Sequence, residues 1–443
     1  MKNVLMLTLV VNVVMAGALA GTSDAQTAAP LRVTLDDAMT RGLASSARID
    51  EARARQDAAE AVVDERIAAT RPTAMASAGY TRTNHVQPFG ITLPNGPFLD
   101  VYPDIPNNFS SRIGASWPLF TFGRSEAAVA AARSEAAASG SDVDVVRTAL
   151  RTEISQAFWQ LYLAHASAVV VNESVARMTN QLDVTREQFA NGLLVPSDVE
   201  RVRAELVHQQ MLVTQSAANV EIAEAVLGRL IGVAPGTHIE TNVEPSSPTH
   251  DSEPDALIQQ ALDARSDVQA LRSRMDAAAE RRRLAEAGNK PSVALAGGVD
   301  YAKPNPRNFP RQDVWGSSWD VGVNASVPLF DGGRRNADVA ESIATERALK
   351  ARADELASTI GLEIRQRLAE IRAARAALEA SAAGIAAATE AERVLGDRFR
   401  VGVATVSDTL DARLAVVRAQ LERDQAAAAL GLAEARLERA LGR

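Results

Sequence analysis

Side chains able to do chemistry are few and scattered in this 443-residue sequence. It has no cysteine, which excludes disulfides, thiolate metal sites, a cysteine nucleophile and an N-terminal lipid-bearing cysteine. The five histidines show no HExxH or comparable ligand spacing: His85, His165, His208, His238 and His250. There is no nucleophile–base pair and no phosphate-binding loop, and Gly332-Gly333 is typical of a turn into a helix. We therefore predict no enzymatic activity, no cofactor and no metal site.

Three aspartates stand near the starts of predicted helices. Asp198 follows Ser197 and Asp408 follows Ser407, while Asp411 comes three residues after Asp408 and shares its helix face. Acids at these positions complement the positive end of a helix dipole, and the two serines are suitable N-caps. A capping role and a functional charged site are both compatible with this pattern.

The composition favours long, closely packed helices. Apolar residues make up 47% of the chain but aromatics only 4%, so small aliphatic side chains, chiefly alanine, supply the apolar surface. Alanine is the best helix former and a poor filler of wide cores. The net charge is −8 and the isoelectric point about 5.4, so we expect no nucleic-acid partner.

The N-terminal segment is typical of an export signal. Residues 1–20 contain Lys2, a largely apolar stretch and a small-residue ending at 18–20. A second cleavage position would follow Ala25. The alternative is a retained membrane anchor, which is disfavoured because the apolar run is short and Asn12 interrupts it. We predict a signal peptide over 1–20 and an exported mature protein.

Proline positions divide the rest of the chain into rods and loops. Prolines crowd 85–108 and 302–312, but none occurs between Pro118 and Pro196 or after Pro328. Because proline in a helix interior costs about 3 kcal/mol, such gaps permit very long helices. We predict long helices, return helices and opening helices at these ranges: 123–190 and 333–400, 197–231 and 406–441, 34–70 and 254–288.

The first long helix carries a coiled-coil pattern. Two interleaved series of positions spaced by seven are apolar at eleven of twelve places: Ile154, Leu161, Ala168, Val175, Leu182, Phe189, and Leu150, Ala157, Ala164, Val171, Met178, Thr185. An ordinary amphipathic helix seldom runs past about 25 residues without caps. A straight helix over 123–190 would be about 100 Å long.

The chain contains two copies of one unit. The segment 117–124 resembles 327–334, and Phe189 and Gly192 return as Phe399 and Gly402, all at a shift of 210. The register changes only in the proline-crowded loop after Pro72, as an insertion in a loop of a duplicated structure would do. We predict a first unit, a linker and a second unit over 34–232, 233–253 and 254–443.

Between the rods, alternation with period two predicts four strands: 73–83, 112–119, 292–301 and 319–329. Val321 and Val323 would face one way and Asp320 and Asn324 the other. Alternating segments of about ten residues suit membrane barrel strands, and a half-exposed sheet on a soluble domain is the alternative. The smallest membrane barrels need about eight strands, so a spanning barrel would require a homo-oligomer.

With these features the sequence resembles the TolC family of outer membrane efflux proteins over about 34–443. The resemblance rests on the duplicated units, on the strand endings 117–120 and 327–330 with their following Gly-Arg, and on Phe-x-x-Gly turns before Ser-Asp. It implies a mainly α fold with a β-barrel portion, in which three chains form an α-helical barrel joined to a twelve-stranded outer membrane β-barrel, four strands per chain.

The function implied by the resemblance is passive. The chain would be the exit duct of a tripartite efflux or type I secretion system, set in outer membrane lipid with a large periplasmic extension. A periplasmic adaptor would connect it to an inner membrane pump that supplies energy and selects the cargo. The alternative from a different class is a periplasmic coiled-coil adaptor or structural protein.

The resemblance also implies roles for the two turns. The adaptor would contact the tip at Gly192, Leu193, Leu194, Ser197, Gly402, Val403, Thr405 and Ser407. The periplasmic aperture would be lined by Asp408, Asp411 and Asp198. Three copies of one acid would repel by about 3 kcal/mol per pair at ~6 Å and an effective dielectric constant of ~20, which favours raised pKa values or a bound cation.

The sequence departs from the best-known members at the aperture. Phe399 and Ala404 occupy the positions where those members use a tyrosine and an arginine to hold the aperture closed. We therefore expect closure here to depend on the acids and on packing.

Overall fold

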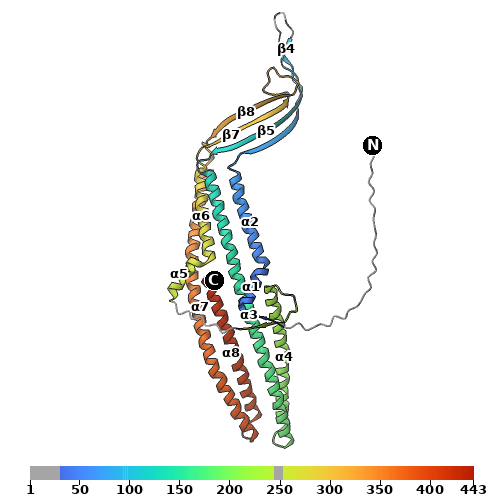
Figure 1. Ribbon diagram of the computed structural model, residues 1–443, viewed down its shortest axis with the longest axis vertical. Coiled ribbons are helices and arrows are strands. Elements are labelled where there is room, and N and C mark those ends of the chain that lie inside the picture. The colour runs from blue at the N-terminus through green and yellow to red at the C-terminus, as the bar shows by residue number, and fades with distance from the viewer. Residues whose placement is uncertain (1–29, 93, 95, 97, 244–252) are drawn as a thin grey trace, which may run out of the picture.

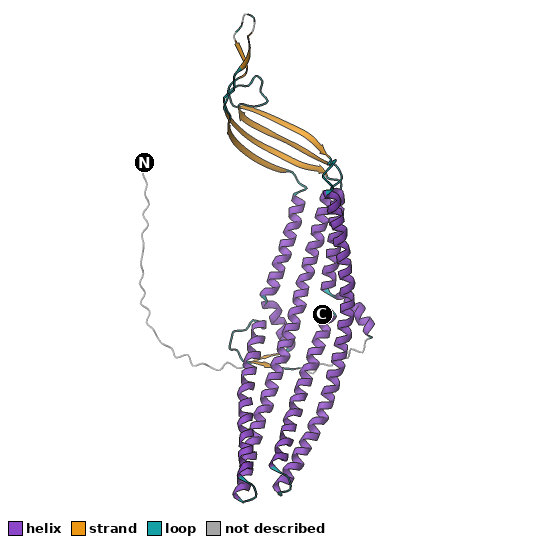
Figure 2. Cartoon of the chain, turned by 180° about the vertical axis from the view of Figure 1, so that it is seen from behind, coloured by secondary structure: helices purple, strands orange, loops and turns teal. Residues whose placement is uncertain are grey.

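Long helical hairpins and a four-stranded sheet form an elongated chain (Figure 1). The computed structural model describes residues 30–443 except 93, 95, 97 and 244–252. The predicted signal peptide and residues 244–252 of the predicted linker thus lie outside the described residues. The sheet is at one end of the rod and the two helix turns are at the other (Figure 2).

The two longest helices have equal lengths, as the constant shift of 210 predicted. Helix α3 spans Arg124–Ala190 and α7 spans Arg334–Arg400, 67 residues each, or about 100 Å. The return helices are α4, Pro196–Ile231, and α8, Val406–Ala440. The predicted long and return helices are therefore confirmed.

The predicted single opening helices are wrong, because each is broken into two. Helices α1 and α2 span Leu35–Ser45 and Ala47–Ala68, and α5 and α6 span Pro254–Ala264 and Ser266–Ala287. The breaks fall at Ser46 and Arg265, whose backbones are extended (ψ 110° and 128°). Neither residue is glycine or proline, so no helix-breaking residue stands at either position.

At Arg265 the break is held by ion pairs rather than by backbone preference. Its guanidinium lies 2.8 Å from Asp267 and 2.7 Å from Glu363 on α7, and it also donates to the carbonyl of Ala440 on α8. The extended residue thus fixes the second repeat's opening helices to both of its long helices.

Four antiparallel strands form one sheet in the order β2-β5-β7-β8. Their bounds are Thr73–Arg82, Asn107–Phe120, Ser292–Lys303 and Gly316–Ser326. The central pair, β5 with β7, joins the two repeats. Two further pairs are small: β3, Phe89–Thr92, with β4, Phe98–Tyr102, and β1, Leu31–Val33, with β6, Ile239–Thr241.

The strand bounds differ from the predicted ones at the ends. Strand β5 starts at Asn107 instead of 112, and β8 covers Gly316–Ser326 instead of 319–329. Strand β8 stops two residues before Pro328, which has no N–H to donate to a ladder.

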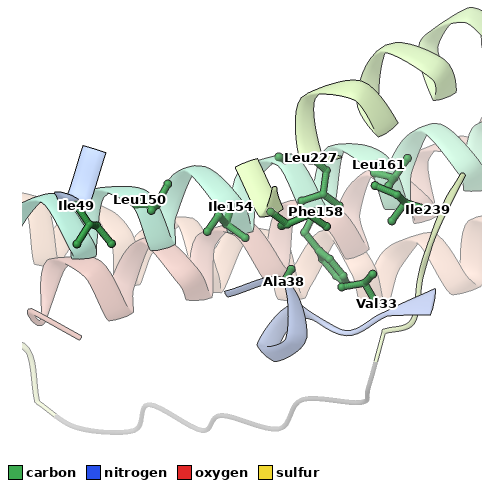
Figure 3. Packing of buried hydrophobic residues seen from close by; sticks show 11 residues of the cluster. Val33, Ala38, Ile49, Leu150, Ile154, Phe158, Leu161, Leu227 and Ile239 are labelled. Atoms are coloured by element: carbon green, nitrogen blue, oxygen red, sulfur yellow. The ribbon is translucent and has the colours of Figure 1, made fainter. Parts of the chain in front are cut away.

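The predicted heptad positions of α3 are mostly buried. Leu150, Ile154 and Leu161 lie in a core that also contains Phe158 of α3 and Leu227 of α4 (Figure 3). Helix α1 and the β1–β6 pair cover this core near the middle of the rod. A second core lies between α5, α7 and α8, and a third lies near the turns.

The two repeats pack along each other in the helical part. Helix α3 contacts α8 and α6 of the second repeat as well as its own return helix α4. None of the helices in the described part of the chain has a stretch apolar enough, over enough residues, to cross a membrane.

Candidate functional site

The two turns at the end of the rod share one backbone conformation. Gly192 and Gly402 both have φ +75°, as predicted for residues that end a helix. Their N–H groups donate to the carbonyls of Phe189 and Phe399 at 2.9 and 3.0 Å. Glycine takes this conformation without the steric cost that a side chain would bring.

The predicted N-caps, Ser197 and Ser407, are wrong. The caps are Val195 and Thr405, two residues earlier. Three residues after Thr405 stands Asp408, which completes a capping box: the backbone N–H of Asp408 donates to Thr405 Oγ1 at 3.2 Å, and the Asp408 carboxylate accepts from Thr405 N at 2.9 Å. This reciprocal pair satisfies two backbone N–H groups at the start of α8. The helix is therefore capped by Thr405 and not by Ser407.

The candidate aperture acids have different surroundings. The hydroxyl and backbone N–H of Thr405 hold the pKa of Asp408 below its usual range within one chain. The Asp198 carboxylate accepts from Val195 N at 3.3 Å. Asp411 is exposed one turn along α8 from Asp408, so these two acids share a helix face while Asp198 lies on the other hairpin.

Replacing Thr405 with valine should remove the capping hydroxyl and lower the free energy of unfolding by about 1 kcal/mol. Because the Asp408 pKa is depressed in the fold, the carboxylate's contribution is present above its unfolded-state pKa and is lost as the pH falls through the folded-state value. On acidification, the free energy of unfolding of Thr405→Val should therefore fall by less than that of the natural chain. Urea unfolding at a series of pH values measures both. Ser407→Ala is the matched control, and an equal effect of both changes would contradict the assignment.

A cluster of apolar side chains joins the four long helices just above the turns. We call Met178, Leu182, Val202, Phe399, Val406 and Leu410 the tip cluster. Phe399 at the end of α7 is 3% exposed there, whereas its repeat equivalent Phe189 is 41% exposed. The two equivalent phenylalanines thus have different surroundings: Phe399 packs in the tip cluster and Phe189 is exposed.

Two of the predicted tip residues contribute to this packing. Leu194 is half-buried and packs against the tip cluster, and Ser407 is half-buried. The other six are exposed: Gly192, Leu193, Ser197, Gly402, Val403 and Thr405. Leu193 and Val403 are large apolar side chains exposed at the two turns.

A half-buried arginine that the sequence analysis missed lies above the tip cluster. Arg413 of α8 donates to the carbonyl of Arg177 on α3 at 2.7 Å and lies 3.4 Å from Glu392 on α7. Burial lowers the pKa of the Arg413 guanidinium, and Glu392 opposes that shift. No sequence motif marks it, because its partners come from two other helices.

Two histidines described above as scattered are brought together. His165 and His238 lie 3.9 and 3.4 Å from the carboxylate of Glu224 in the middle of the rod. Among the described residues, no group of three or more acidic and histidine side chains is arranged to hold a metal ion.

The sheet has one apolar and one polar face, as the alternation predicted. Ala76, Ile113, Val299 and Trp319 form one cross-strand row, and Val321 and Val323 share their face. These large apolar side chains are exposed. The opposite face carries Asp320, Gly322 and Asn324.

Aromatic side chains border the apolar face at both ends. Tyr80, Phe109, Tyr301 and Trp315 contact one another at one end, with ring centroids 4.9–5.9 Å apart. Trp117 lies at the other end, eight residues from Phe109 along β5. At about 3.4 Å per residue and a tilt of about 40°, the band between them is about 21 Å tall, close to the apolar band of a membrane barrel.

The sheet also has two open edges. Strands β2 and β8 each have one neighbour, so one side of each presents unpaired N–H and C=O groups. The family model of outer membrane efflux proteins matches this chain over residues 39–233 and 257–443. The chain belongs to the outer membrane efflux protein family.

A curated relative in this efflux protein family matches over a short stretch. Outer membrane efflux protein BepC of Brucella suis biovar 1 (strain 1330) is 29% identical over 121 residues, which are 27% of this chain. The match covers 26% of BepC, so the chain spans about a quarter of the length of the curated relative it matches.

Solved structures match over nearly the whole chain. The outer membrane protein VceC of Vibrio cholerae has a TM-score of 0.78 and 21% identity, covering 92% of this chain and 96% of VceC. The Campylobacter jejuni CmeC outer membrane channel has a TM-score of 0.77 and 16% identity, covering 92% and 85%. At such identities the likeness shows the fold.

The predicted family, fold class and outer membrane location are thereby confirmed. In an outer membrane efflux protein, the apolar face with its aromatic borders lies against lipid, because the charged strand residues between those borders, Arg112, Asp300 and Asp320, are on the opposite face. The polar face then looks inward, and the helices extend into the periplasm.

Proposed function

We propose that the chain is the exit duct of a tripartite efflux or type I secretion system and that it works as a homotrimer. It would conduct passively what an inner membrane pump delivers through a periplasmic adaptor. The observation that carries this proposal is the four-stranded sheet with two open edges and one exposed apolar face. Because membrane barrels need about eight strands or more, one chain cannot enclose a lumen.

Closure would pair β8 of one chain with β2 of the next around a three-fold axis, giving twelve strands. Such head-to-tail contacts form a ring when the rotation closes. An exposed apolar stripe on α4 supports a neighbour in the helical part too: Val207, Met211, Ile222 and Val226. Their spacing places them on one side of the helix.

The division into repeats 34–232 and 254–443 remains a proposal, supported by the two segments that the family model matches. The adaptor would dock on the two turns. Their exposed apolar side chains, Leu193 and Val195 in one and Val401 and Val403 in the other, support contact with a partner helix pair.

Cross-linking tests the assembly cleanly because the natural chain has no cysteine. Single cysteines replacing Ala78 on β2 and Ser317 on β8 lie on the lipid-facing side of the two open edges. Oxidation of the double variant in outer membranes should give a ladder ending at three chains, and neither single variant should give one. A ladder running past three, or a soluble periplasmic monomer as expected for an adaptor, would contradict the trimeric duct.

The aperture assignment to Asp408, Asp411 and Asp198 also remains a proposal. Asp411 is the cleaner probe, because the Asp408 carboxylate also caps α8. Asparagine at both positions removes the charge and retains an acceptor for the cap.

Asp408→Asn with Asp411→Asn should weaken block of single-channel current by divalent cations added on the tip side, by about tenfold or more in block constant. The physical reason is the loss of six carboxylate charges around one axis in a trimer. Planar-bilayer recording measures it, with Asp64→Asn on α2 as the control for neutralising an aspartate far from the tip. Unchanged block would show that these acids do not line the constriction.

A further inference from the structure

The polar face of the sheet carries very little charge, and that charge is gathered in one place. Among the residues of the four described strands that share this face, only Arg112, Asp300 and Asp320 are charged. Their neighbours in the same rows are small: Ser77, Gly114, Gly298 and Ser318, with Met75 as the one large exception.

Arg112 lies between the two acids and is bonded to both. Its Nη1 donates to Asp300 at 2.6 Å and its Nη2 to Asp320 at 3.0 Å. Asp300 is directly opposite Arg112 on β7, and Asp320 is one row along on β8, so a single side chain links three strands.

A glycine lets the guanidinium lie flat against the sheet. A Cβ on Gly298 would stand 2.9 Å from Arg112 Nη2, closer than real contacts allow. Position 298 pairs with Gly114 on β5, so the strands beneath the arginine carry no side chain on this face. The arginine therefore lies along the wall instead of projecting away from it.

A second arginine reaches Asp320 from the loop between β7 and β8. Arg307 lies 3.1 Å from Asp320 and donates to the carbonyl of Trp319 at 2.8 Å. Asn305 in the same loop donates to the carbonyl of Gly316 and to Ser318 Oγ, at 2.9 and 3.1 Å. We call Arg112, Arg307, Asp300 and Asp320 the wall cluster; it has two positive and two negative charges.

We propose that the wall cluster sets the ion preference of the barrel end of the channel by holding the charges on the inward face of the four described strands, together with Arg307, in a neutral, wall-bound network. The inference rests on the proposed function, since it requires this face to line a lumen. Ions passing a neutral network meet little net field, so the barrel would discriminate weakly between anions and cations. Selectivity would then be left to other parts of the path.

Removing one sign of charge from the wall cluster should make the barrel selective. Asp300→Asn with Asp320→Asn leaves two positive charges per chain, and Arg112→Gln with Arg307→Gln leaves two negative charges. At about 0.05 M salt we expect the anion-to-cation permeability ratio to rise roughly fivefold in the first variant and to fall roughly fivefold in the second. Both shifts should shrink near 1 M salt, where the Debye length is about 3 Å.

The measurement is the reversal potential in planar bilayers under a salt gradient. The quadruple variant with all four changes should return near the natural value, because it is neutral again although its network is gone. Lys303→Gln, which changes a charge on the lipid-facing side of β7, should leave the ratio unchanged. If a double variant fails to assemble, Asp300→Asn alone should shift the ratio in the same direction by a smaller factor.

The outcomes separate this inference from the proposed function. If the natural chain forms no channels, the duct itself is wrong. If channels form but opposite charge changes leave the reversal potential equal, or the quadruple variant keeps a shifted ratio, the wall cluster does not set the ion preference.

Discussion

Phe399→Ala should lower the free energy of unfolding by about 3–5 kcal/mol and leave the periplasmic end of the channel open more often. Phe399 is fully packed in the tip cluster, where it touches side chains from α3, α4 and α8. Alanine would leave a cavity where the two helical hairpins meet. Urea unfolding measures the first effect and single-channel conductance the second.

The duplication provides the control for this change. Phe189→Ala removes the same ring from the same motif 210 residues earlier, where the side chain is 41% exposed. We expect a loss below about 1 kcal/mol there and no rise in open probability. Equal effects at both positions would show that the tip cluster does not hold the hairpins together.

Gly431→Val should destabilise the chain by about 3 kcal/mol or more. Gly431 on α8 lies directly beneath the indole ring of Trp159 on α3, so a Cβ built on it would overlap the ring. Trp159 cannot move aside freely, because it packs edge-on against Phe158 and Tyr162 at 5.7 and 5.5 Å. The close approach of α3 and α8 therefore requires glycine. Thermal unfolding of the purified protein measures the loss.

The control is the same substitution where a helix has room. Gly384 on α7 has no atom within 4 Å of a built Cβ. Gly384→Val should change the stability by no more than about 0.5 kcal/mol, since valine also has the better helix propensity. A large loss at Gly384 would indicate that a neighbouring subunit packs closely there.

The features that depend on nearby residues could be predicted from the sequence. Helix lengths followed from the absence of proline, the turns at Gly192 and Gly402 from glycine after a helix, and the two faces of β8 from alternation. Each of these is set within a few residues along the chain. The N-caps predicted at Ser197 and Ser407 failed because Asp at the third helical position selects a cap two residues earlier. The single opening helices failed because the chain is extended at Ser46 and Arg265, where no glycine or proline stands.

By itself, the sequence determined the two equal rods, their turns and a sheet with one apolar face. These features depend on backbone propensity and on the period of apolar side chains, which are set by residues close together in the chain. Only the tertiary structure decided that Phe399 is buried while Phe189 is exposed, and that Arg112 meets Asp300 and Asp320 across strands of both repeats. The physical reason is that equivalent motifs become different when the repeats pack side by side: each residue's partners then come from helices and strands about 200 positions away, and no local pattern specifies which face they will cover.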